Sequence, residues 1–282
     1  MIGMSPEDKT PRPPHFPMQP PSPSRLRSNL WLLANLLRRE IRDRYVGTAT
    51  GLGWVLLQPL LMLAIYSFVF SYVFRIRLPG SDNPLTYVVF VAVALWPWFL
   101  LQEGLVRAMG ALRAQAALIR KTALSRELPV LASVLASCLI HLTGYALVLT
   151  CLALAGGDLQ LRGLPLLGFS VASLILIVLA LGYLSSILQL VWRDLEHAVS
   201  PVFGILFYAT PILYPLQLVP ESLRPYVALN PLGWWLERLR DGLLRGALPG
   251  IVDIAALLAA AALLLLARAI FLRVATHAED LL

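Results

Sequence analysis

Residues that could carry out chemistry are few and far apart in this sequence. Four histidines and two cysteines occur, and they lack the spacing of a metal-ligand set. The phosphate-binding pattern GxxxxGK[ST] is absent, since neither lysine follows a run of glycines. Paired carboxylates and nucleophile–base pairs are also missing from the apolar segments. We therefore expect no catalytic residue, no metal and no cofactor in this chain, and transport is the favoured class of function.

His141 is the only histidine inside a predicted membrane span. An ionisable group at membrane depth is a functional hypothesis. The alternative is a neutral histidine that packs between helices and bonds to a neighbour, since no acidic residue lies close to it in the sequence. Both interpretations stay open at this point.

A proline-broken apolar stretch runs from Thr210 to Pro231 and reads TPILYPLQLVPESLRPYVALNP. Proline removes a backbone donor and clashes with the preceding turn, so an unbroken helix cannot hold this pattern. Irregular backbone at membrane depth is tolerated only where protein buries it or where it lines a watery cavity. The stretch therefore marks a candidate pathway.

The composition predicts the elements that position these residues. With 58% hydrophobic and 14% charged residues, the chain is too apolar for an ordinary soluble domain. A bilayer core about 30 Å thick requires roughly 20 apolar residues as a helix. We predict an all-α integral membrane protein with six transmembrane helices, over residues 54–74, 85–101, 129–155, 164–191, 198–219 and 251–267.

Lysine and arginine predict the orientation of these spans. Of 23 such residues, 16 lie on the side that holds both termini and seven lie on the other side. Positive charge is enriched in cytoplasmic loops, so both termini are predicted to be cytoplasmic. The net charge of +7 is therefore a topology signal, and nucleic acid is not an expected partner because no basic stripe interleaved with aromatics occurs on a soluble module.

Several segments lie outside the spans. Residues 1–24 are polar and proline-rich, which predicts a disordered cytoplasmic extension before a membrane domain at 25–282. Residues 28–45 have an apolar and a basic face, as is typical of an interfacial helix, and either anchoring or partner docking would explain them. Residues 107–128 suit a surface helix under the membrane or a docking loop. Residues 232–250 predict a short amphipathic helix at the outer face.

Five motifs together resemble one family. They are RDRYVGTATGLGWVLLQPLLMLAIYSFVF at 42–70, LWPWFL at 95–100, LIRKTALSRELPVL at 118–131, WRDLEH at 192–197 and TPILYPLQLVPESLRPYVALNPLGWWLERLRDGLL at 210–244. In this order and spacing they resemble membrane subunits of ABC exporters of the ABC-2 class, specifically the polysaccharide and O-antigen (lipopolysaccharide) export permeases. The resemblance covers most of residues 29–282, and the motifs are specific jointly rather than singly.

This resemblance implies a transport subunit of the cell inner membrane that is not itself an enzyme. Two copies would form a pore, and each would dock on a separate ATPase subunit that binds ATP and Mg. The candidate ATPase-contact residues are Arg38, Arg42, Arg120, Lys121, Arg126, Glu127, Arg193 and Asp194. For Arg193 and Asp194, simple capping of helix ends is the alternative.

The resemblance also implies a re-entrant gate at residues 210–250, on the outer side. Its candidate residues are Thr210, Pro211, Tyr214, Pro215, Pro220 and Pro231. A lipid-linked glycan would pass through the pore, and aromatic rings suit the apolar faces of sugars. Candidate pathway residues are Tyr45, Trp54, Tyr66, Trp96, Trp98 and Tyr208. For Trp96 and Trp98 an interfacial aromatic belt is the favoured alternative.

Two features depart from the family pattern, and alternatives stay open. The extension at 1–24 is not expected, and Gln102 and Glu103 occupy positions where small neutral residues are expected. Glu103 and Arg107 also predict that the helix continues beyond its span with a charge pair on it. The same fold would serve export of teichoic acid, capsule, lipid or drug. A membrane-embedded transferase that uses His141 or outer-loop acids is the alternative of a different class.

Overall fold

The computed structural model describes residues 23–45, 53–76, 78, 83–121 and 124–275. Every regular element in these ranges is a helix, which confirms the predicted all-α class. In chain order the elements are α1 (Pro23–Tyr45), α2 (Trp54–Phe68), the π-helical turn η2 (Val69–Val73), α3 (Pro84–Ala114), α4 (Ala116–Lys121), α5 (Glu127–Leu154), the 3₁₀ turn η3 (Leu161–Gly163), α6 (Leu164–Val191), α7 (Leu195–Ala209), the 3₁₀ turn η4 (Leu216–Leu218), α8 (Arg224–Ala228), α9 (Pro231–Arg245) and α10 (Ile251–Ala275). The predicted extension at 1–24 lies outside the described residues, except that α1 already begins at Pro23.

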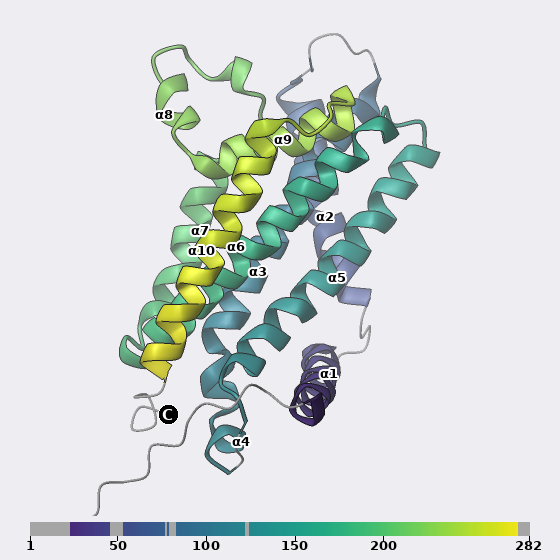
Figure 1. Ribbon diagram of the computed structural model, residues 1–282. Coiled ribbons are helices and arrows are strands. Elements are labelled where there is room, and N and C mark those ends of the chain that lie inside the picture. Colours follow the sequence, from purple (N-terminus) through teal and green to yellow (C-terminus); the bar gives the residue numbers. More distant parts are fainter. Residues whose placement is uncertain (1–22, 46–52, 77, 79–82, 122–123, 276–282) are drawn as a thin grey trace, which may run out of the picture.

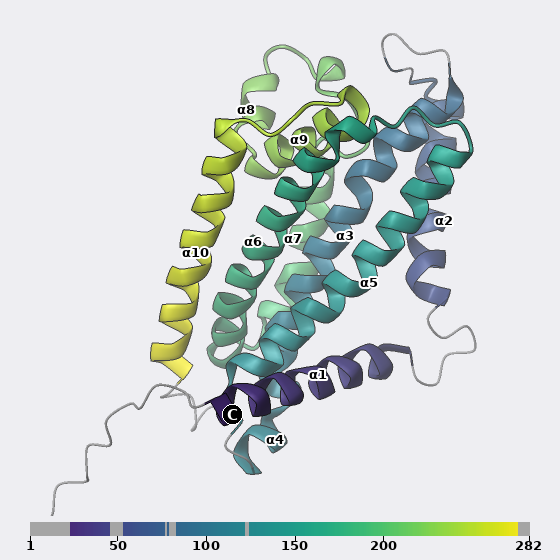
Figure 2. The same cartoon turned by 45° about the vertical axis from the view of Figure 1, so that its right-hand side comes forward.

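The helices form a bundle around α3, which packs against α2, α5, α6, α7 and α9. The helix α10 lies along α6 at the edge of the bundle, and α1 crosses one end of it, beside α5 and close to α4 (Figures 1 and 2). The short helices α8 and α9 lie at the opposite end. We call these the α4 end and the α8 end.

Five helical segments are long and apolar enough to cross a membrane. They are Leu56–Val73, Leu85–Ala114, Glu127–Leu154, Leu161–Val191 and Ile251–Ala275, and they match five of the six predicted spans. The chain is therefore a multi-pass membrane protein.

The predicted span 198–219 is interrupted. It contains α7, an apolar helix of 15 residues that ends at Ala209. Thr210 has an extended backbone, as steric contact with the following Pro211 favours. A sixth crossing of the membrane stays a prediction.

The second predicted span, 85–101, is part of a longer helix. Asn83 caps α3 by accepting a hydrogen bond from the Leu85 amide, and the helix continues without a break to Ala114. Glu103 and Arg107 lie on this continuation, 3.6 Å apart. The predicted extension of the helix and its charge pair are thus confirmed.

Small residues let α3 and α6 approach closely. A Cβ added to Gly104 would lie 2.8 Å from Val178 Cγ1, and a Cβ added to Gly182 would lie 2.8 Å from Ala108 Cβ. Both distances are shorter than ordinary carbon contacts. Without a hydrophobic force between helices in lipid, such close packing stabilises a membrane bundle.

Gly163, immediately before α6, lies against Gly242 of α9. A Cβ on Gly163 would be 1.8 Å from the Gly242 carbonyl oxygen, a backbone atom that cannot move aside alone. Its φ of −84° is ordinary, so a substitution would act through this contact only. We expect Gly163→Ala to lower the free energy of unfolding by about 3 kcal/mol, measured by denaturant unfolding in detergent.

Gly168→Ala is the matched control. Gly168 lies in α6, and no atom of the described residues is within 4 Å of the position of its added Cβ. Because alanine is the better helix former, this variant should be neutral or stabilised by up to about 1 kcal/mol. Equal destabilisation of the two variants would contradict the contact argument.

Candidate functional site

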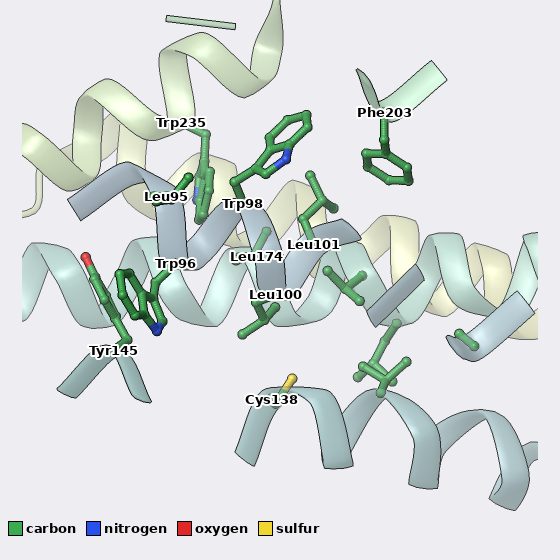
Figure 3. Close-up of a cluster of buried hydrophobic side chains, with 14 of the residues drawn as sticks. Leu95, Trp96, Trp98, Leu100, Leu101, Cys138, Tyr145, Leu174, Phe203 and Trp235 are labelled. Atoms are coloured by element: carbon green, nitrogen blue, oxygen red, sulfur yellow. The ribbon is translucent and has the colours of Figure 1, made fainter. Parts of the chain in front are cut away.

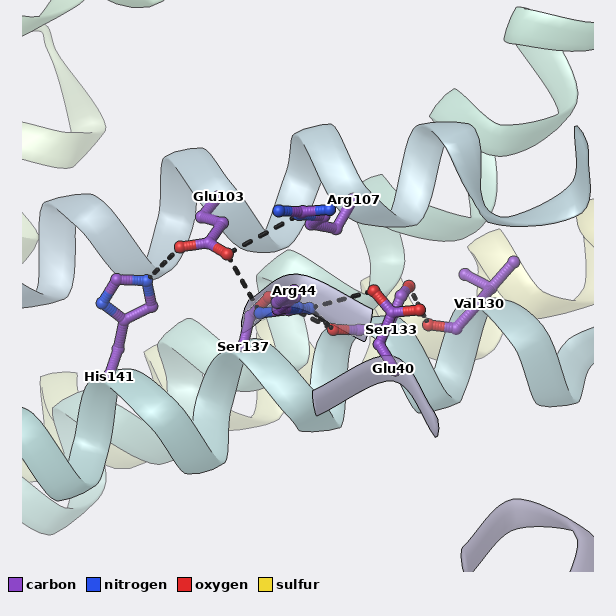
Figure 4. Close-up of polar contacts among 8 residues, drawn as sticks. All are labelled: Glu40, Arg44, Glu103, Arg107, Val130, Ser133, Ser137 and His141. Atoms are coloured by element: carbon purple, nitrogen blue, oxygen red, sulfur yellow. Dashed lines mark hydrogen bonds and ion pairs between the residues drawn. The ribbon is translucent and has the colours of Figure 1, made fainter. Parts of the chain in front are cut away.

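A polar cluster joins α1, α3 and α5 where α1 crosses the bundle (Figure 4). Glu103 of α3 is its centre. Its Oε1 accepts a hydrogen bond from Arg44 Nη1 at 3.0 Å, and its Oε2 lies 2.8 Å from His141 Nε2. Arg107 Nε lies 3.6 Å from Oε1. One carboxylate therefore ties the end of α1 and the middle of α5 to the central helix.

The Arg44 side chain is only 1% exposed. Besides Glu103, its guanidinium donates to Glu40 Oε1 at 3.3 Å, to the Ser133 carbonyl at 3.1 Å and to the Ser137 hydroxyl at 3.1 Å. Removing a cation from water costs several kcal/mol unless partners replace the water. These partners fix α1 to α5 as well as to α3.

This cluster supplies the acidic partner that the sequence did not show for His141. The sequence offers no acid beside it, but α3 and α5 lie side by side, and Glu103, 38 residues away, faces its ring. His141 is buried, and its Nδ1 has no hydrogen-bond partner among the described residues. It is thus a buried histidine bonded to a neighbouring helix, and a functional role stays a prediction. The unexpected acid at 103 was the one signal that could have identified the pair.

A cleft of about 650 Å³ opens beside the cluster. It lies between α2 and α3, with contributions from α1, α5 and α7. Its side chains combine rings, amides and charged groups: Trp54, Phe99, Gln58, Gln102, Glu40, Glu103, Arg107, His141 and Glu196. Apolar walls with a few directed polar groups are typical of ligand sites, and this mixture suits stacking on a ring together with hydrogen bonds to hydroxyl groups.

Two of the predicted pathway aromatics lie in the interior of the bundle. Trp96 and Trp98 are 1% and 2% exposed (Figure 3). The Trp98 ring meets Phe203 and Phe207 of α7 edge-on, at centroid distances of 5.8 and 5.7 Å. Both tryptophans pack the core in this conformation, and their role in a pathway stays a prediction.

The other predicted aromatics occupy the surface or its edge. Trp54 and Tyr208 are exposed, and Trp54 also lines the cleft. Tyr66 is half-buried, with its ring 5.6 Å from that of Phe207. The side chain of Tyr45 lies outside the described residues. Among the predicted aromatics whose side chains are described, Trp54 alone lines the polar cleft.

Buried side chains hold the beginning of the proline-broken stretch. Arg240 of α9 is 1% exposed, and it donates to the Pro211 carbonyl at 2.7 Å and to the Ile212 carbonyl at 2.8 Å. Tyr87 of α3 donates its hydroxyl to the Leu213 carbonyl at 2.6 Å. Buried backbone groups need partners, and these three successive carbonyls find theirs on two other helices.

Arg240 is stabilised within the protein by two further contacts. Its guanidinium lies 3.5 Å from the centre of the Phe90 ring and 3.4 Å from Glu237 Oε2, and a cation over an aromatic face is attracted to it. Burial lowers the pKa of Arg240 to about 10, while Glu237 opposes the shift. The residue therefore remains charged at neutral pH. Sequence reasoning missed this role, because the bonded carbonyls lie 28 and 29 residues earlier.

The six predicted gate residues fall into two groups. Thr210, Pro211 and Pro215 are buried, and Tyr214 is partly buried. Asn230 Nδ2 donates to Thr210 Oγ1 at 2.9 Å and closes the stretch on itself. Pro220 and Pro231 are exposed, and the segment between them includes α8, which projects at the α8 end (Figure 1). The stretch thus begins with residues 210–215, which are mostly buried, and ends with residues 220–231, which we call the exposed arm.

The predicted ATPase contacts also divide. Six of them are exposed on elements at the α4 end: Arg38, Arg42, Arg120, Lys121, Arg193 and Asp194. The other two, Arg126 and Glu127, make contacts with α10. Both carboxylate oxygens of Glu127 accept from Arg268, at 3.0 and 3.1 Å, and Arg126 donates to the Ala275 carbonyl. Their predicted contact with a partner stays a prediction.

Comparisons with known proteins cover most of this architecture. The family model for the ABC-2 type transporter matches residues 32–244. The O-antigen export system permease protein RfbA of Klebsiella pneumoniae is 29% identical over 77% of this chain and 82% of that protein. The protein of the same name from Myxococcus xanthus is 30% identical over 71% and 75%. The polysialic acid transport protein KpsM of Escherichia coli is 24% identical over 75% and 80%.

Proposed function

Since this chain belongs to the ABC-2 type transporter family, we propose that it is the membrane-spanning permease subunit of an ATP-driven polysaccharide exporter. The observation that carries the proposal is its similarity, over 77% of its length, to a protein named as an O-antigen export system permease. The cargo would be a lipid-linked glycan that moves from the cytoplasmic to the outer face of the cell inner membrane.

The different chemistry of the two ends of the bundle supports this proposal. Exposed cations at the α4 end suit a cytoplasmic ATPase, which would supply ATP and Mg²⁺, and both termini would lie on that side. Two copies of the chain would enclose the pathway. At the α8 end, α7 and the residues after it would complete the sixth crossing and form a re-entrant gate, with the exposed arm as its moving part.

Reversing two charges on α4 should weaken the association with the ATPase. Arg120 and Lys121 are exposed at the end of this short helix, and an electrostatic contact there would become repulsive. We expect the double variant Arg120→Glu/Lys121→Glu to insert normally but to recover much less ATPase on co-purification. Arg75→Glu, an exposed site just after η2 and outside the predicted ATPase-contact segments, is the control. Full recovery of ATPase with the double variant would exclude this docking surface.

Deletion of the gene tests the export function itself. We expect surface glycan to disappear, lipid-linked glycan to accumulate on the cytoplasmic side, and a plasmid copy to restore the surface glycan. A membrane-embedded transferase would give a different result, because its loss would change glycan structure rather than glycan location. Normal surface glycan in the deletion strain would overturn the proposal.

A further inference from the structure

We propose that the cleft beside Glu103 accepts an uncharged glycan chain and rejects a polyanionic one. The inference rests on the proposed function and adds the charge class of the cargo. It distinguishes between the two kinds of cargo in the names of the relatives, O antigen and polysialic acid. Polysialic acid carries a carboxylate on every sugar.

Three of the four Asp, Glu, Lys and Arg side chains that line the cleft are carboxylates. They come from three elements: Glu40 from α1, Glu103 from α3 and Glu196 from α7. The side chains of Glu103 and Glu40 remain 31% and 26% exposed, and Glu196 is exposed, so all three reach the open space. Like charges repel more strongly beside a protein than in bulk water, because the effective dielectric constant is lower. A polyanion would meet this repulsion at each repeat.

The neighbouring cations reduce the negative charge of the cleft but do not reverse it, because three carboxylates face two arginines. Arg44 is almost fully buried, and its guanidinium is held by the two carboxylates and two serines of the polar cluster. Arg107 is the one arginine among the lining residues that the structure describes. Its Nε lies 3.6 Å from Glu103 Oε1, so its charge is paired with one of the three carboxylates. Arg38 and Arg42 are exposed on α1, outside the described lining.

The remaining lining suits neutral sugar groups. Gln58 and Gln102 each supply an amide, with a donor and an acceptor, and Trp54 and Phe99 supply rings. His141 lines the same cleft while buried, and its Nδ1 has no partner among the described residues. This nitrogen points away from the carboxylate that binds the other one (Figure 4). A hydroxyl group both donates and accepts, so it can bond to both amides, whereas the buried Nδ1 of His141 lies out of its reach.

Two of the polar residues in the cleft depart from the pattern that the family resemblance implies. Gln102 and Glu103 are the two residues that depart from the pattern expected after the LWPWFL motif, and both line the cleft. A repulsive element of this kind is how binding sites exclude a competing ligand. The carboxylate of Glu103 would act in this way on a polyanion.

The first test uses the polymer that accumulates in the deletion strain. Its repeat unit, isolated after removal of the lipid carrier, should contain no sialate, uronate or phosphate group. A polyanionic repeat unit would overturn the inference and leave the export function standing. Absence of any accumulated polymer would overturn both.

The second test measures binding to the purified complex of this chain with its ATPase. Two probes are compared: an oligosaccharide released from the accumulated polymer, and the same oligosaccharide after oxidation of its primary hydroxyl groups to carboxylates. The unmodified complex should bind the neutral probe at least about tenfold more tightly. Glu196→Lys and, separately, Glu103→Gln should narrow this preference severalfold.

Glu221→Lys is the matched control, because this carboxylate is 90% exposed, comes just before α8 and is outside the cleft lining. It should leave the preference unchanged. Glu196 is exposed and lies outside the polar cluster, so its variant keeps the test valid where Glu103→Gln fails to fold. Equal binding of the two probes, or an unchanged preference in both cleft variants, would overturn the inference.

Discussion

Replacement of Arg240 with glutamine should lower the free energy of unfolding by about 3–5 kcal/mol and abolish export. The shorter side chain cannot reach both the Pro211 and the Ile212 carbonyl, which now accept hydrogen bonds of 2.7 and 2.8 Å. Each buried acceptor left without a donor costs about 1–3 kcal/mol. The measurements are unfolding of the purified chain in detergent and the amount of glycan on the cell surface.

Arg245→Gln is the control in the same helix. Arg245 is 57% exposed and pairs with Glu237 and Asp241 at the surface, where an ion pair contributes less than about 1 kcal/mol. This variant should unfold almost like the unmodified protein. If Arg240→Gln were no less stable than Arg245→Gln, the beginning of the proline-broken stretch would not depend on Arg240.

Replacement of Gly204 with tryptophan should abolish export while ATP hydrolysis by the complex continues. Gly204 is exposed on α7, and no atom of the described residues lies within 4 Å of an added Cβ. The chain can therefore hold a large ring there without a clash of its own. The exposed side of α7 also presents Val202, Ile205 and Tyr208, so added bulk would fill whatever space α7 borders in the assembled exporter.

Gly168→Trp is the control for added bulk, because Gly168 is also exposed, helical and free of close neighbours among the described residues. It should leave export intact. Thr210 is unsuitable for the same experiment. It is fully buried and bonded to Asn230, so a large side chain there would test folding rather than the pathway. A normal amount of surface glycan in the Gly204→Trp variant would contradict a role for α7 in the export pathway.

The helices themselves were predictable from the sequence for a simple reason. An uncharged run of about 20 residues spans a bilayer as a helix, in which its backbone groups bond to one another, and five of the six predicted spans have matching helices. The sixth differs because Thr210 and Pro211 end α7 after 15 residues. The length of a charge-free run shows only how apolar the segment is. Where the helix ends depends on the backbone conformation at Thr210 and Pro211.

The candidate site was less predictable, because its contacts join residues far apart in the chain. Glu103 meets Arg44 and His141 across 59 and 38 residues, and no local periodicity reports such pairs. Arg240 shows the same limit. In the sequence it indicates only that α9 is too polar to cross the membrane, whereas in the fold it binds the carbonyls of a distant loop.

Transport in inverted membrane vesicles tests the central claim most directly. The vesicles would contain this chain and its ATPase, with the cytoplasmic face outward, and would carry lipid-linked glycan from the deletion strain in the outer leaflet. We expect ATP to make the glycan resistant to an added glycosidase, and we expect no such protection in vesicles that lack either chain. Protection without this chain, or exposure of the glycan unchanged by ATP when both chains are present, would contradict the proposed export function.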